Sequence, residues 1–199
     1  MKNKNFTIHT QLNQQLITHL NKLQDRYSKI LPIRIDIHYA KDDKFNTNIH
    51  IAKQEITCLL FQAMQFELDI VGYAVVMEFN QNKHIHFHAI FYVNGQKRQK
   101  YYPVYVVLER AWHELTNGYL YDCQRNNYCI NGLKMINHHD HEAFRSACYM
   151  LSYLAKTEQK EPFKKRYSDC LFLSEVPPPS HRGKPRTLGV SKFLIPLSI

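Results

Sequence analysis

The spacing of hydrophobic and polar residues along the chain predicts both helices and strands. Leucines recur every three or four positions within residues 1–30, as in an amphipathic helix: Leu12, Leu16, Leu20 and Leu23. Strict alternation over 31–40 predicts a strand with one buried face. The same two patterns predict a helix over 47–66, strands over 68–79 and 84–93, helices over 104–115 and 142–156, and one or two short strands within 119–137. This order predicts an α+β domain, with helices on one face of an antiparallel central sheet of about five strands.

The chain length suits a single hydrophobic core with extensions. A chain of 199 residues can bury a core without disulfides or a structural metal. Residues 1–30 are predicted to form an N-terminal helical extension, and 31–174 the main domain. The segment 175–199 is rich in proline and then in basic residues, and is expected to pack on the same domain or to extend it.

The charge balance points to a polyanionic partner. Lys and Arg number 26 against 17 Asp and Glu, a formal net charge of +9, which favours nucleic acid or an anionic membrane surface. No apolar run is long enough for a transmembrane helix, and the N-terminus lacks the apolar region of a secretory signal. The odd number of cysteines, 5, without a CxxC pair, is typical of reduced thiols, so we expect a cytoplasmic protein.

The strongest chemical signal is the alternation His84-Ile85-His86-Phe87-His88. Alternate residues of a strand share one face, so the three imidazoles are expected in a row. A short polar link, 80–83, joins this strand to the preceding one and predicts a β-hairpin in which Glu78 lies opposite His86. Glu78, His86 and His88 would then form a site for a divalent metal with open coordination positions. His84 lies beside the turn, where it is either solvated or a further contact.

A second group of chemical residues lies on the last predicted helix. Tyr149, Tyr153 and Lys156 are spaced to share one helical face, opposite an apolar stripe. Taken alone, this pattern is most simply explained by tyrosines that pack on the sheet and a solvated lysine.

Together, the two groups resemble the motifs of the HUH endonucleases, named for a His-hydrophobic-His motif. The likeness is to replication initiators of rolling-circle phages and plasmids, particularly those of filamentous phages (inoviruses). IHFHAIF (85–91) is similar to the HUH motif, YLAK (153–156) to the Tyr-x-x-Lys motif, and RIDIHYA (34–40) to a less specific first motif. The resemblance covers about 31–190 and implies the ferredoxin-like or RRM-like fold of that superfamily.

The resemblance implies roles for individual residues. His86 and His88 would bind the metal, Mg²⁺ or Mn²⁺, with Glu78 as third ligand from the pairing argument. Tyr153 would be the nucleophile and Lys156 its neighbouring cation, while Tyr149 has the spacing of a second nucleophile or simply of one helical turn. Two imidazole ligands favour Mn²⁺.

The implied activity is that of a single-stranded DNA endonuclease and ligase. It would nick an origin through a 5′-phosphotyrosine intermediate and leave a 3′-hydroxyl, which starts rolling-circle replication in a bacterial host cell. Single-stranded origin DNA, a host helicase and a polymerase are the implied partners, with no membrane association.

Three basic runs are candidates for contacts with DNA phosphates. They are Lys97, Arg98 and Lys100; Lys164, Lys165 and Arg166; and Arg182, Lys184 and Arg186. Tyr101 and Tyr102 adjoin the first run and could stack unpaired bases. Asp36 and His38 lie on the polar face of the first strand and could approach the metal, although solvent exposure is the simpler expectation for both.

Other functions share parts of this pattern. A transposase or a mobilisation relaxase would use the same chemistry, and a role for His84 as a ligand would favour the relaxase. A DNA-binding regulator would keep the scaffold without catalysis, and an aromatic-rich sheet also suits RNA binding. The complete set Glu78, His86, His88, Tyr153 and Lys156 favours an active enzyme over the regulator.

Overall fold

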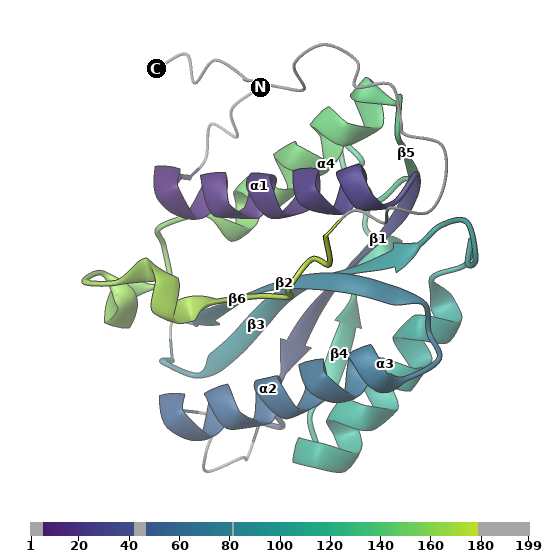
Figure 1. Ribbon diagram of the computed structural model, residues 1–199. Helices are drawn as coiled ribbons and strands as arrows, with labels where there is room; N and C mark the ends of the chain where they lie inside the picture. The colour runs from purple at the N-terminus through teal and green to yellow at the C-terminus, as the bar shows by residue number, and fades with distance from the viewer. Residues whose placement is uncertain (1–5, 42–46, 81, 179–199) are drawn as a thin grey trace.

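The computed structural model describes residues 6–41, 47–80 and 82–178 and contains an antiparallel sheet with helices on both faces (Figure 1). The strands are β1 Lys29–His38, β2 Ile70–Phe79, β3 Ile85–Asn94, β4 Tyr119–Asp122, β5 Ile136–Asn137 and β6 Leu171–Leu173. The helices are α1 Thr10–Arg26, α2 Ile49–Gln65, α3 Tyr102–Thr116 and α4 His141–Leu154. Short 3-10 turns, η1 Cys123–Arg125, η2 Glu161–Phe163 and η3 Tyr167–Cys170, complete the regular structure of this part of the chain.

The strand order is β4-β1-β3-β2-β6, and β5 pairs with the start of β1. The unit β1-α2-β2-β3-α3-β4 therefore has the connectivity of a ferredoxin-like domain. The prediction of an α+β fold with an antiparallel sheet is confirmed.

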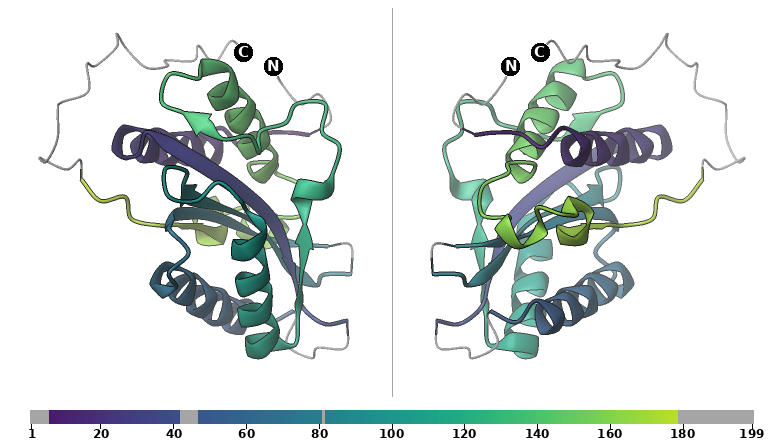
Figure 2. Two further views of the ribbon diagram at one scale, coloured as in Figure 1. Left: turned by 90° about the vertical axis from the view of Figure 1, so that its right-hand side faces the viewer. Right: turned by 90° about the vertical axis from the view of Figure 1, so that its left-hand side faces the viewer.

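Two helical layers enclose the sheet. Helices α2 and α3 cover one face, and α1 and α4 cover part of the other (Figure 2). The sequence pattern predicted helices on one face only, which describes α2 and α3. Gly72 of β2 allows α1 to pack closely on the second face. A Cβ at this position would lie only 3.1 Å from the Leu23 side chain of α1, which is tighter than an ordinary van der Waals contact.

The predicted boundaries of the main helices are close to those observed. Asn48 and Asp140 cap the N-termini of α2 and α4 by accepting hydrogen bonds from backbone N–H groups. Asn117 caps the C-terminus of helix α3 and adopts the left-handed conformation with φ 56° that favours Asn or Gly at this position. Helix α4 ends at Leu154 instead of reaching Lys156.

The region 119–137 contains two short strands, β4 and β5, as the pattern predicts. Between residues 123 and 137, only Ile136 and Asn137 form a strand, and η1, bends and turns occupy most of the rest. The side chain of Asn131 accepts a hydrogen bond from the Leu133 N–H (2.9 Å) and so stabilises a turn in place of a strand. Strand β6, which the pattern did not predict, pairs with β2 at the opposite edge of the sheet from β4.

Candidate metal centre

The β2–β3 hairpin has the predicted register. Glu78 pairs with His86, and the backbone N–H of Asn80 donates to the His84 carbonyl (2.9 Å) at the end of the ladder. The Asn80 side chain accepts from the backbone N–H of Asn82 and of His84, which stabilises the turn. This register places Glu78, His86 and His88 on the sheet face that α1 and α4 partly cover.

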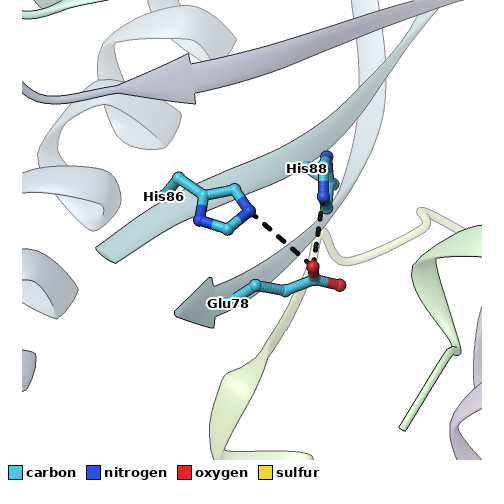
Figure 3. Close-up of side chains that lie close together, drawn as sticks. All are labelled: Glu78, His86 and His88. Atoms are coloured by element: carbon cyan, nitrogen blue, oxygen red, sulfur yellow. Dashed lines mark ion pairs between the residues drawn. The ribbon is translucent and has the colours of Figure 1, made fainter. Parts of the chain in front are cut away.

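The three side chains converge on one point (Figure 3). Glu78 Oε2 lies 3.2 Å from His88 Nε2 and 3.7 Å from His86 Nε2. Glu78 is fully buried, and both histidines are more than nine-tenths buried. Their ligand atoms all lie within 4.8 Å of one another. The group could therefore hold a metal ion.

The hydrogen bonding of these atoms fits a metal. Among the described residues, the buried His88 Nε2 has no hydrogen-bond partner, and it faces Glu78 Oε2, whose neighbours include the ammonium of Lys156. Buried polar atoms are normally satisfied, so an imidazole nitrogen that lacks a hydrogen bond and points at a carboxylate oxygen fits a metal ligand. Two imidazole nitrogens and a carboxylate oxygen form a donor set that suits a divalent transition metal.

Asp36 orients one of the histidines. Its Oδ1 lies 2.5 Å from His88 Nδ1 and accepts a hydrogen bond from it. With Nδ1 held by Asp36, Nε2 is the ring nitrogen that points toward Glu78 and is placed to ligate a metal. Carboxylate–histidine pairs of this kind commonly support metal-ligating imidazoles. Asp36 and His38 are half-buried, so the simpler expectation that both are solvent-exposed was wrong.

Two lysines hold the carboxylate of Glu78. Lys160 Nζ donates to Glu78 Oε1 (2.5 Å) and to the Lys156 carbonyl (2.7 Å). Lys156 Nζ lies 2.9 Å from Glu78 Oε2. Lys160 is fully buried, and such burial of an ammonium is costly without these partners. One oxygen of Glu78 is thus fixed by Lys160, while the other faces the histidines and Lys156.

The electrostatics keep Glu78 and Asp36 ionised. Burial alone would raise the pKa of Glu78, but His88, Lys160 and Lys156 lower it to about 2. Burial would also raise the pKa of Asp36, but His88 and Arg34 outweigh this effect and lower the pKa to about 2.

The pKa values of the two histidines are shifted in opposite directions. Burial, with the charge of His88, lowers the pKa of His86 to about 4. The pKa of His88 is raised, because the carboxylates of Asp36 and Glu78 outweigh burial. A metal bound at Nε2 of His88 would take the place of a proton.

Tyr153 reaches the same centre from α4. Its hydroxyl accepts a hydrogen bond from Lys156 Nζ (3.2 Å), and its ring centroid is 5.3 Å from that of His88. The guanidinium carbon of Arg34 lies 4.5 Å from the centroid of the Tyr153 ring. Lys156 follows the end of α4 and is buried, contrary to the solvated lysine that the pattern suggests in isolation. Tyr153 and the triad thus share one polar cluster on the same face of the sheet.

Tyr149 and His84 lie outside this cluster. Within the described ranges, neither side chain makes a hydrogen bond, an ion pair or a ring contact with the triad. Tyr149 is half-buried one turn before Tyr153, and His84 is half-buried beside the hairpin turn. The feature that would favour a relaxase, a third histidine in the metal group, is therefore not observed in this part of the chain.

The basic runs occupy different places. Lys97, Arg98 and Lys100 follow the end of β3 that is farther from His86, about 27 Å away along the strand. Two of them form ion pairs with Asp69, at 3.4 and 3.5 Å, and Arg98 also donates to the carbonyls of Glu67 and Leu68.

The second run, Lys164, Lys165 and Arg166, is exposed. It follows Phe163, whose ring is 5.9 Å from that of Phe79, the residue after Glu78. The third run, Arg182, Lys184 and Arg186, lies outside the described residues.

Three residues of the cluster were missed or undervalued. The sequence pattern does not identify Lys160 or Arg34 as site residues, and for Asp36 it offers an approach to the metal only as the alternative to solvent exposure. The alternation of β1 places Arg34 and Asp36 on one face, but their contact with β3 depends on a non-local strand pairing in which Asp36 lies opposite His88. Lys160 had no motif to indicate it beyond its position four residues after Lys156.

No protein-family model, curated protein or solved structure matches this chain. Of the helices that the structure describes, none combines the length and the apolar character needed to span a lipid bilayer.

Proposed function

We propose that the protein is a metal-dependent, single-stranded DNA endonuclease and ligase that nicks a replication origin through a phosphotyrosine intermediate. One observation carries the proposal. The hydroxyl of Tyr153 and the carboxylate of Glu78 share the ammonium of Lys156, at 3.2 and 2.9 Å, so a nucleophile, a cation and a metal-ligand set meet at one place. The formal net charge of +9 supports a polyanionic substrate.

The proposed reaction exchanges one phosphate ester for another. The Tyr153 oxygen attacks phosphorus, the bond between phosphorus and the 3′-oxygen breaks, and the tyrosine proton ends on that 3′-oxygen. The products are a 5′-phosphotyrosine and a free 3′-hydroxyl. Because the energy of the ester is retained, the reverse attack by a 3′-hydroxyl rejoins DNA without a nucleotide cofactor.

The residues of the cluster have distinct tasks in this scheme. Glu78, His86 and His88 would hold a divalent metal, which supplies Lewis-acid polarisation of the scissile phosphate when bound. Lys156 places positive charge beside the oxygen that becomes anionic during attack. Arg34 lies against the Tyr153 ring and restricts its position. Asp36 and Lys160 orient His88 and Glu78.

The first experiment tests the nucleophile. Wild-type protein is incubated with Mn²⁺ and labelled single-stranded DNA of candidate origin sequence, and covalent adducts are separated on a denaturing gel. Tyr153→Phe should abolish the adduct and leave DNA binding intact, because the ring is kept and only the attacking oxygen is removed. Tyr149→Phe, one helical turn away, is the matched control and should retain the adduct. An undiminished adduct in Tyr153→Phe would contradict the assignment.

The second experiment tests the metal ligands. His86→Ala should eliminate Mn²⁺-dependent nicking and weaken Mn²⁺ binding measured by calorimetry. His84→Ala, two residues earlier in the same hairpin, should change neither. If His86→Ala responds to Mn²⁺ like the wild type, the ligand assignment is wrong. If His84→Ala also loses the response, three histidines take part and a relaxase becomes the better proposal.

A further inference from the structure

Two exposed tyrosines lie on β4, an edge strand of the sheet, and on the same face as the metal centre. Tyr119 and Tyr121 of β4 are 47% and 48% exposed, among the most exposed large hydrophobic side chains of the described residues. β4 is an edge strand of the sheet (Figure 1). Its register with β1 places Tyr119 beside His38 and Tyr121 beside Asp36, so both rings lie on the face that carries the triad.

A row of parallel rings connects Tyr119 with the metal centre. The Tyr119 and His38 rings are stacked with centroids 5.1 Å apart and planes 16° apart. The His38 and His86 rings are stacked in turn, at 5.7 Å and 7°. A flat ring stacked on the exposed side of this row would continue the same orientation toward a metal ligand.

A second set of contacts links Tyr121 with the proposed nucleophile. The Tyr121 hydroxyl donates to Asn126 Oδ1 (2.8 Å), and Asn126 Nδ2 donates to the Tyr128 hydroxyl (3.1 Å). The guanidinium of Arg34 lies near the ring of Tyr128 (5.9 Å) and near that of Tyr153 (4.5 Å). The hydrogen bond to Asn126 keeps the exposed ring in a defined position, which lowers the entropy cost of stacking a ligand on it.

The chemistry of this surface suits unpaired bases. Aromatic side chains stack on the faces of bases, which are accessible only where the strand is single. A cation is close by, since Arg125 follows β4; its side chain is 69% exposed and lies 3.1 Å from Asp122 through Nε, which leaves its other nitrogens for a phosphate. We propose that Tyr119 and Tyr121 form a stacking platform that binds unpaired nucleotides of single-stranded DNA beside the cleavage point. This inference rests on the proposed function, because it places the bound strand at the triad.

The test measures binding separately from cleavage. A fluorescein-labelled oligothymidylate is titrated with the full-length protein in EDTA, and anisotropy gives the dissociation constant. Tyr119→Leu and Tyr121→Leu should each weaken binding about tenfold, the loss typical of one stacked base. Tyr119→Phe keeps the ring and should bind like the wild type. Phe61→Leu removes an aromatic ring that is 68% exposed on α2, in the opposite helical layer, and should have no effect.

The outcomes separate the platform from the proposed function. If both leucine variants bind like the wild type while Tyr153 still forms adducts, the platform is wrong and the endonuclease stands. If binding depends on both tyrosines but no DNA yields an adduct, the platform stands and the endonuclease is wrong. An oligouridylate that binds more tightly than the DNA, with the same dependence on both tyrosines, would overturn DNA as the ligand. Equal losses in Phe61→Leu would show a nonspecific effect and would also overturn the platform.

Discussion

The two faces of the central sheet are built from the same strands but contain different chemistry. On the face toward α2 and α3, the residues of β1, β2 and β3 are apolar and fully buried: Ile33, Ile35, Ile37, Val75, Met77, Phe87, Ala89 and Phe91. On the other face, the neighbouring positions of these strands carry the charged or ionisable groups of the centre: Arg34, Asp36, Glu78, His86 and His88. Because side chains alternate along a strand, each strand contributes to both faces.

The comparison shows how one sheet can supply both stability and a polar site. Burial of apolar area contributes about 25 cal/mol per Å² and needs no partner. A buried charge is costly unless it is paired, and each carboxylate of the centre has cationic neighbours. Glu78 lies against Lys156 and Lys160, and Asp36 lies against His88 and Arg34. We therefore expect the apolar face to contribute most of the stability and the polar face to determine metal binding.

Phe87→Ala tests the apolar face and should have the largest effect. Phe87 is fully buried, and its ring packs edge-on against Trp112 with centroids 6.1 Å apart. Truncation should lower the free energy of unfolding by about 4 kcal/mol, measured by urea denaturation. The Mn²⁺ affinity of the folded variant should not change, because the lost ring lies across the sheet from the triad.

Phe61→Ala is the control for this truncation, since Phe61 is largely exposed. It should change stability by no more than about 0.5 kcal/mol. If Phe87→Ala instead weakens Mn²⁺ binding with little loss of stability, the two faces are not energetically separate.

His19→Gln tests the pH dependence of the polar face. Burial lowers the pKa of His19 from 6.5 to about 4, and its Nε2 lies 3.0 Å from both the carbonyl and the hydroxyl of Ser174. As the pH falls through this range, the unfolded chain binds the proton first. The wild type should therefore lose up to about 3 kcal/mol of stability from this residue.

In urea denaturation at several pH values, His19→Gln should show a smaller loss of stability on acidification than the wild type. His50→Gln, at an exposed position of α2, should retain the wild-type dependence. Parallel pH profiles for wild type and His19→Gln would argue against a neutral buried His19.

Asp36→Asn tests the orientation of His88 and should have the smallest of the three effects. An amide can no longer serve as the anionic acceptor for His88 Nδ1. Loss of such a supporting carboxylate typically lowers metal affinity about 10- to 100-fold, or about 2 kcal/mol. Calorimetric titration with Mn²⁺ measures the change. Asp169→Asn alters a partly exposed aspartate of η3 and should bind Mn²⁺ like the wild type; equal affinities in the two variants would exclude a supporting role for Asp36.

Local sequence patterns determined much of this protein. Each predicted helix is present, and the hairpin register that pairs Glu78 with His86 followed from the alternation of β3 and the short link before it. These features depend on residues close together in the chain, and backbone geometry permits few alternatives to them. The position of Tyr153 on the last long helix was also evident from its spacing.

Tertiary structure alone decided how these parts meet. The pairing of β1 with β3 brings Asp36 to His88, and the segment after α4 returns Lys160 to Glu78. Both contacts join residues at least 52 positions apart. The spacing of hydrophobic residues within one segment does not predict which distant strand or loop will pack beside it. The free-energy cost of burying a charge also depends on the position of its counter-charge. Lys156 and Lys160 are buried because the tertiary structure places them beside Glu78, and the local sequence does not indicate this.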